Sequence, residues 1–154
     1  MAISTRISNS PDAVVAGDVH AGCMTNTNNV ATIQRMTEAI VAQDHDTLAS
    51  IFTDDYEFHM RGPVPVAGDH QGLGGMLEAI GWIFEKTNGD VKLDQQFCVA
   101  TDGWAGEGEF ATLGRNGKTL EIENAMKYRF ENGRIAEMWF YLGATQEEAD
   151  AFFG

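Results

Sequence analysis

The stretch VKLDQQFCVATDGWAGEGEFATLGRNGKTLEIENAMKYRFENGRIAEMWFYL, residues 91–142, decides the fold of this chain. Its apolar and polar residues alternate with a period of two, which is typical of β-strands with one buried face. The pairs Asp102-Gly103, Asn116-Gly117 and Asn132-Gly133 interrupt the pattern with residues that favour tight hairpin turns. We therefore predict four consecutive antiparallel strands, over 91–100, 104–113, 119–130 and 135–142.

The rest of the chain has mostly the hydrophobic spacing of helices. This spacing predicts helices over 29–43, 46–52, 73–86 and 145–153. Tyr56, Phe58 and Met60 alternate with polar residues, which predicts one strand before the loop 61–72, where glycine and proline allow only short extended pieces. Helices followed by long antiparallel strands indicate an α+β fold, with helices on one face of a curved sheet. A strongly bent sheet that is closed by helices forms a cone, and the open end of the cone is a natural ligand cavity.

Composition narrows the classes of partner. The chain has 154 residues, 44% of them hydrophobic, which suits one globular domain. Its formal net charge of -13 disfavours nucleic acid and anionic membrane surfaces as partners. Cys23 and Cys98 fit no metal or redox spacing, and no segment has the pattern of a membrane span or signal peptide, so we expect a cytoplasmic protein. We expect a loose extension over 1–24 and a single domain over 25–154.

The order of elements also resembles a known superfamily. The segments that carry the resemblance are 32–72, 122–143 and the C-terminal ATQEEADAFFG. Together they resemble the NTF2-like superfamily, and within it the SnoaL-like polyketide cyclases and the relatives of ketosteroid isomerase. The resemblance implies a cone-shaped, cystatin-like α+β barrel, in which a strongly curved mixed sheet wraps around three N-terminal helices and a short C-terminal helix follows. It also implies a homodimer formed through the sheet face, and no cofactor.

The catalytic groups of these relatives are missing at the corresponding positions. Met36, Met60 and Met126 stand where the isomerases have a tyrosine, a carboxylate base and a second carboxyl group. The pocket histidine of the cyclases also corresponds to Met126, and their acidic base to Phe140. Because a thioether takes up no proton at neutral pH, steroid-isomerase chemistry by that mechanism is disfavoured.

Three titratable residues remain as candidate catalytic groups. His59 belongs to a Phe-His-x-x-Gly run similar to one in this subgroup, although strict alternation from Phe58 places it on the opposite face of the strand. Glu137 is the remaining candidate base in the last-strand region. Glu109 shares one face of its strand with Glu107; we favour the register in which both face solvent, and the opposite register would bring an acid and a base into the cavity.

Other residues are candidates for binding the ligand or lining its cavity. Asn124 lies among apolar neighbours, either as a ligand-binding amide or as a buried amide with its hydrogen bonds satisfied. No spacing of His, Cys, Asp or Glu predicts a metal site. The candidate ligand contacts are Met36, Tyr56, Phe58, Met60, Trp82, Phe97, Asn124, Met126, Tyr128, Trp139 and Phe140.

Two functions fit these observations. The first is a cofactor-independent enzyme of the cyclase, isomerase, dehydratase or epoxide-hydrolase type that acts on a small apolar or aromatic molecule. It predicts that at least one of His59, Glu137 and Glu109 points into an apolar pocket. The second is a binding or carrier domain for a hydrophobic ligand, which the three methionines at catalytic positions favour.

Overall fold

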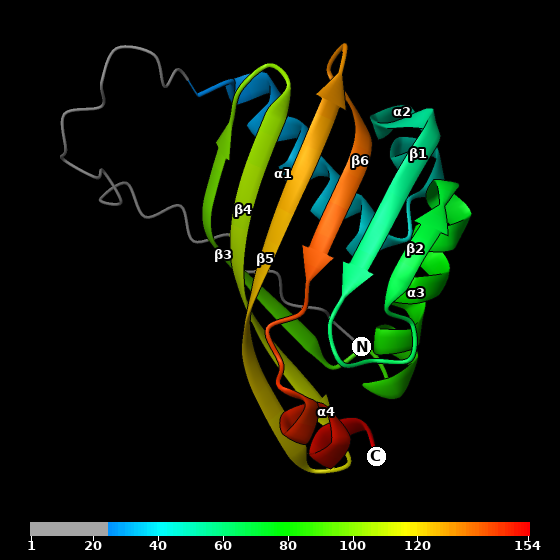
Figure 1. Ribbon diagram of the computed structural model, residues 1–154, viewed down its shortest axis with the longest axis vertical. Helices are drawn as coiled ribbons and strands as arrows, with labels where there is room; N and C mark the ends of the chain where they lie inside the picture. Colours follow the sequence, from blue (N-terminus) through cyan, green and yellow to red (C-terminus); the bar gives the residue numbers. More distant parts are fainter. Residues whose placement is uncertain (1–24) are drawn as a thin grey trace, which may run out of the picture.

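The computed structural model describes residues 25–154, and the extension expected over 1–24 lies outside these residues. The first half contains two helices, a hairpin and a third helix: α1 (Thr27–Ala42), α2 (His45–Ile51), β1 (Phe52–Arg61), β2 (Gly68–Gln71) and α3 (Gly72–Lys86) (Figure 1). Four long strands and a short helix follow: β3 (Val91–Ala100), β4 (Trp104–Arg115), β5 (Lys118–Glu131), β6 (Arg134–Tyr141) and α4 (Gln146–Phe153). No helix within 25–154 has the length and apolar character needed to cross a membrane.

Side-chain caps fix where three of the helices begin. Asn26, Asp44 and Thr145 cap α1, α2 and α4, and each accepts a hydrogen bond from a backbone N–H of the first turn. These bonds satisfy donors that a helix cannot satisfy internally. The predicted helices are therefore confirmed, with starts shifted by one or two residues.

The strands form one mixed six-stranded sheet in the order β2-β1-β6-β5-β4-β3. β1 and β6 are parallel, whereas the other neighbouring strands are antiparallel. Asn116-Gly117 and Asn132-Gly133 both have two positive φ angles, of 50° and 76° and of 50° and 77°. Two positive φ angles are the signature of the type I′ hairpin turn, so these two predicted turns are confirmed.

Two features implied by the resemblance need correction. The edge strands β2 and β3 do not pair with each other, so the sheet is curved but open and is not a closed barrel. Only α1 and α2 precede the sheet, because α3 follows the hairpin of β1 and β2. The sheet therefore does not wrap around three helices at the N-terminus.

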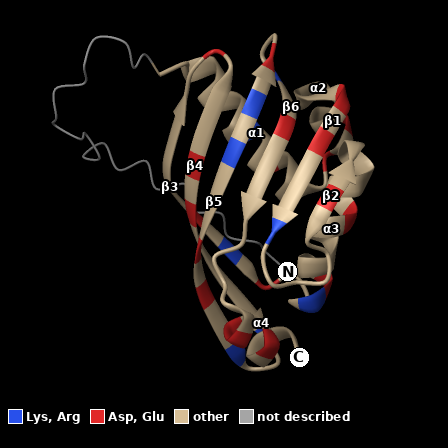
Figure 2. Cartoon of the chain, in the orientation of Figure 1, with Lys and Arg blue, Asp and Glu red and all other residues tan. Residues whose placement is uncertain are grey.

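The two faces of the sheet differ in cover and in composition. Helices α1 and α3 cover the inner face of the sheet (Figure 1). Buried side chains of β5, such as Met126 and Tyr128, lie on this face. The outer face carries the alternate residues of each strand, and Figure 2 shows basic positions on β5 beside acidic positions on β6 and β1. Lys127 and Arg129 belong to this outer set, so the predicted alternation of β5 is confirmed.

Candidate functional site

A cavity of about 90 Å³ lies between the inner face of the sheet and helices α1 and α3. Met36, Met60 and Met126 form part of its wall without filling it, as does Phe140. Most of the remaining wall is aliphatic. The polar residues of the lining are Thr37, Glu107, Glu109, Asn124 and Tyr128.

Glu107 and Glu109 of β4 both point inward, so the register that we favoured from the sequence is wrong. They are 2% and 7% exposed. Gly106 and Gly108 face outward, and a side chain added at Gly108 would meet the ring of Phe97 on the neighbouring β3. Gly108 thus leaves room on the outer face for the ring of Phe97, and the glutamates occupy the inner face.

Hydrogen bonds hold Glu107 on both of its oxygens. The Tyr128 hydroxyl donates to Oε2 over 2.5 Å, and the Gln95 side-chain amide donates to Oε1 over 2.7 Å. A carboxylate that accepts two donors is stabilised in its charged form. Burial acts in the opposite direction and is the larger effect, so the pKa of Glu107 is raised.

Asn124 connects Glu109 to the backbone. The Asn124 amide oxygen accepts from the Gly143 N–H over 3.1 Å, and its NH₂ group donates to Glu109 Oε1 over 3.2 Å. The second oxygen of Glu109, Oε2, has no hydrogen-bond partner within residues 25–154. Because Glu109 lines the cavity, this oxygen is available to a bound molecule.

The pKa of Glu109 rises to about 7, first because burial penalises the charged form and second because Glu107 repels it. The hydrogen bond from Asn124 lowers the pKa of Glu109 but does not offset these two effects. A carboxyl group with this pKa can both give and take a proton near neutral pH, which is what general acid–base catalysis requires.

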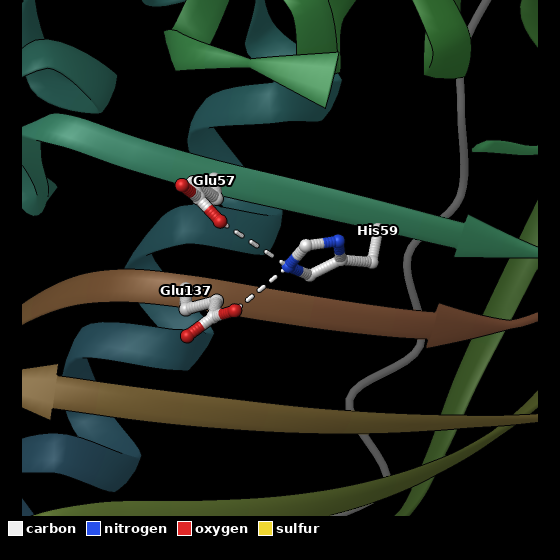
Figure 3. Close-up of side chains that lie close together, drawn as sticks. All are labelled: Glu57, His59 and Glu137. Atoms are coloured by element: carbon white, nitrogen blue, oxygen red, sulfur yellow. Dashed lines mark hydrogen bonds and ion pairs between the residues drawn. The ribbon is translucent and has the colours of Figure 1, made fainter. Parts of the chain in front are cut away.

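His59 and Glu137 lie on the outer face, away from the cavity. The two ring nitrogens of His59 face carboxylate oxygens: Nδ1 is 2.7 Å from Asp69, and Nε2 is 2.8 Å from Glu137 (Figure 3). Burial alone would lower the pKa of His59, but the hydrogen bonds to these two carboxylates raise it. The alternation that placed His59 opposite Phe58 is confirmed, and neither His59 nor Glu137 lines the cavity.

Five candidate ligand contacts also lie outside the cavity wall. Tyr56 and Phe58 are fully buried in the core, and Tyr56 donates to the sulfur of Met76. Trp82 packs against Phe153 of α4. The other two, Phe97 and Trp139, belong to the outer face, where Phe97 is 55% exposed and Trp139 stacks on His59. The sequence could not separate these positions from the cavity wall, because large aromatic side chains also occur in a solid core and on the outer face of a sheet.

A family model describes most of this fold. The SnoaL-like domain matches residues 33–138. The chain belongs to the SnoaL-like family. Its resemblance to the NTF2-like superfamily is thereby confirmed, while a comparison with curated proteins finds no match.

Solved structures support the same fold for this SnoaL-like chain. Bal32a, from a soil-derived mobile gene cassette, is similar with a TM-score of 0.72 and 25% identity, over 83% of this chain and 98% of that one. A cystatin-like protein of unknown function from Xanthomonas campestris has a TM-score of 0.69 and 28% identity, over 82% and 98%. A candidate SnoaL-like polyketide cyclase from Jannaschia has a TM-score of 0.69 and 13% identity, over 89% and 97%.

The family match concerns the fold, and the cavity is described by this chain's own residues. The pairing of Glu107 and Glu109 inside the cavity corresponds to the second of the two registers that the sequence allows. Gln95 and Gly143, which position the pair and its amide partner, were missed because their roles depend on contacts with residues distant in the sequence.

Proposed function

We propose that this protein is a cofactor-independent acid–base enzyme of the cyclase, isomerase, dehydratase or epoxide-hydrolase type, acting on a small apolar substrate. The observation that carries the proposal is Glu109, a buried carboxyl group with a pKa of about 7 and one uncommitted oxygen in an apolar cavity. Membership of the SnoaL-like family supports the same reaction class.

In this proposal each polar group of the cavity has a separate role. Glu109 transfers the proton, as an acid toward a substrate oxygen or as a base toward a carbon-bound proton or water. Asn124 orients Glu109 and retains a second N–H that can donate to a substrate oxygen. Glu107 contacts Tyr128 and Gln95 with its two oxygens, so it acts by repelling charge on Glu109.

Proton abstraction can be tested before the natural substrate is known. A panel of small neutral ketones is incubated with the protein in D₂O, and loss of the α-proton signals is followed by NMR; small epoxides are screened for hydrolysis in parallel. We expect exchange or hydrolysis for at least one compound, and loss of it in Glu109→Gln. The matched control is Glu121→Gln, which removes an exposed carboxylate on the outer face of β5. Activity that persists in Glu109→Gln would contradict the proposal.

The second candidate function is a carrier for a hydrophobic ligand. The three methionines in the cavity wall favour it, because methionine adapts to the shape of varied apolar ligands. Calorimetry with the same compounds separates the two functions: saturable binding with neither exchange nor hydrolysis supports the carrier, and turnover excludes it.

We also propose a homodimer formed through the outer face of the sheet. Three exposed apolar side chains lie close together on β3 and β4: Phe97 (55% exposed), Val99 (54%) and Trp104 (45%). A contiguous apolar patch of this kind, unlike single scattered residues, is typical of a protein–protein contact. Sedimentation velocity should give a dimer for the wild type and a monomer for Phe97→Glu. A wild-type monomer at high concentration would reject this assembly.

A further inference from the structure

Two glutamates oppose each other where β1 and β6 pair in parallel. Glu57 and Glu137 are direct cross-strand partners, and His59 lies two residues further along the same face. Like charges that face each other across two strands destabilise a sheet unless a positive charge lies between them. Arg129 supplies part of that charge through a 3.0 Å hydrogen bond to Glu137 Oε2. Glu57 has no Lys or Arg partner within residues 25–154.

The three side chains converge on one point. His59 Nε2 is 2.8 Å from Glu137 Oε1 and 3.7 Å from Glu57 Oε2. Figure 3 shows both carboxylates directed at this nitrogen, and the three ligand atoms lie within 4.8 Å of one another. Two ligand atoms of a tetrahedral zinc ion, each at about 2.0–2.1 Å from it, are separated by roughly 3.3 Å. The two distances from His59 Nε2, 2.8 Å to Glu137 and 3.7 Å to Glu57, lie on either side of this value.

The orientation of the imidazole gives an independent argument. Nδ1 lies 2.7 Å from Asp69 and Nε2 lies 2.8 Å from Glu137, so each ring nitrogen faces a carboxylate oxygen. When Nδ1–H donates to Asp69, Nε2 is directed toward the two glutamates, which is the direction that a metal-binding nitrogen needs. A carboxylate on the other nitrogen is the arrangement that orients metal-binding histidines and raises their basicity.

We propose that Glu57, His59 and Glu137 bind one divalent transition-metal ion of the zinc class on the outer face, with Asp69 orienting the histidine. An imidazole with two carboxylates suits Zn²⁺, whereas Mg²⁺ and Ca²⁺ prefer sites made of oxygen alone. The ion clamps β1 to β6 and leaves a fourth position for water. The site lies on the opposite face from the cavity and is independent of the proposed acid–base function.

Metal binding is tested on the full chain after treatment with a chelator and dialysis into metal-free buffer. Zn²⁺ is titrated by calorimetry, and Co²⁺ by its visible absorption, which reports a tetrahedral site. We expect one equivalent of Zn²⁺ to bind and to raise the melting temperature, and Mg²⁺ to leave it unchanged. Glu57→Gln should weaken Zn²⁺ binding at least tenfold, and Asp69→Asn by about 10–100-fold.

The choice of variants keeps the test decisive. Glu57 is 44% exposed at its side chain, so Glu57→Gln removes a ligand without disturbing the core; His59→Ala is a second variant, and its circular dichroism spectrum verifies folding. Glu121→Gln is the control and should bind as the wild type does. His20 and Cys23 lie outside the described residues and offer other ligands, so Zn²⁺ binding that is equal in wild type and Glu57→Gln would overturn the site. Failure of the wild type to bind Zn²⁺ at submillimolar concentration would overturn it as well.

Discussion

The inner and outer faces of one sheet hold glutamates in opposite electrostatic states. Glu109, on the inner face, has its pKa raised to about 7 by burial and by Glu107. Burial would also raise the pKa of Glu137 on the outer face, but hydrogen bonds to His59 and Arg129 outweigh it and the pKa is lowered. The contrast shows that partners, rather than residue type, decide which carboxyl group can exchange a proton near pH 7.

The largest difference should be seen in turnover when a carboxyl group is removed from the inner face or from the outer face. Glu109→Gln should reduce turnover by about 10²–10⁴-fold, because it removes the proton-transfer group. Glu137→Gln should leave turnover within a factor of about two, since Glu137 does not line the cavity. The measurement is turnover of the compound identified by the exchange or hydrolysis screen. An equal loss of turnover in the two variants would contradict the proposal that only the inner face carries the proton-transfer group.

The dependence of stability on pH should be the next largest effect. Because the folded-state pKa of Glu109 is raised from 4.5 to about 7, the protonated form stabilises the fold below pH 4.5. This stability is lost as the pH rises toward 7, and the loss amounts to about 3 kcal/mol. Urea unfolding of wild type and Glu109→Gln should therefore show a steeper decline with pH in the wild type. Parallel curves would mean that Glu109 is not desolvated.

A smaller effect is expected at the amide that orients Glu109. Asn124→Ala leaves the Gly143 N–H without its partner and should cost about 1–3 kcal/mol of unfolding free energy. It also removes a hydrogen bond that lowers the pKa of Glu109, so the midpoint of the pH–rate profile should move upward. Chemical denaturation and the rate profile measure the two effects separately. A midpoint that stays in place would show that the amide does not influence the proton-transfer group.

The smallest effect should be found on the outer face. Arg129→Met removes the ion pairs with Glu137 and Glu131, but about a third of the Arg129 side chain is exposed to solvent. Ion pairs of this kind contribute at most about 1 kcal/mol. Chemical denaturation at low and high salt should show a small loss that salt reduces further. A loss several times larger would indicate that the outer network is as tightly coupled as the inner one.

The fold was largely readable from the sequence, whereas the site was only partly so. Alternation and the two Asn-Gly pairs specify β4, β5 and β6, because each signal is local. The direction of Glu109 was not readable, because it becomes visible only in the pairing of β4 with β3, where Phe97 lies over Gly108 on the outer face. A local pattern of alternating glycine and glutamate is compatible with either face.

The outer cluster was not readable from spacing for a related reason. His59 and Glu137 are 78 residues apart, and they meet only because β6 returns beside β1 in parallel. An antiparallel hairpin can be predicted from the residues of its turn, but a pair of parallel strands has no such local sequence signal. The absence of a metal-binding spacing in the sequence therefore says little about clusters assembled between distant strands.

The Gly143 N–H that holds Asn124 has a chemical consequence for the cavity. A Cβ at position 143 would collide with the backbone of Glu123, so no other residue fits there without moving the chain. With its oxygen held by this backbone donor, the amide cannot rotate to offer that oxygen to a guest molecule. The cavity wall at Asn124 therefore offers a hydrogen-bond donor and no acceptor. A ligand with an acceptor oxygen can bind the Asn124 N–H, whereas a ligand hydroxyl has no acceptor at Asn124 to which it can donate.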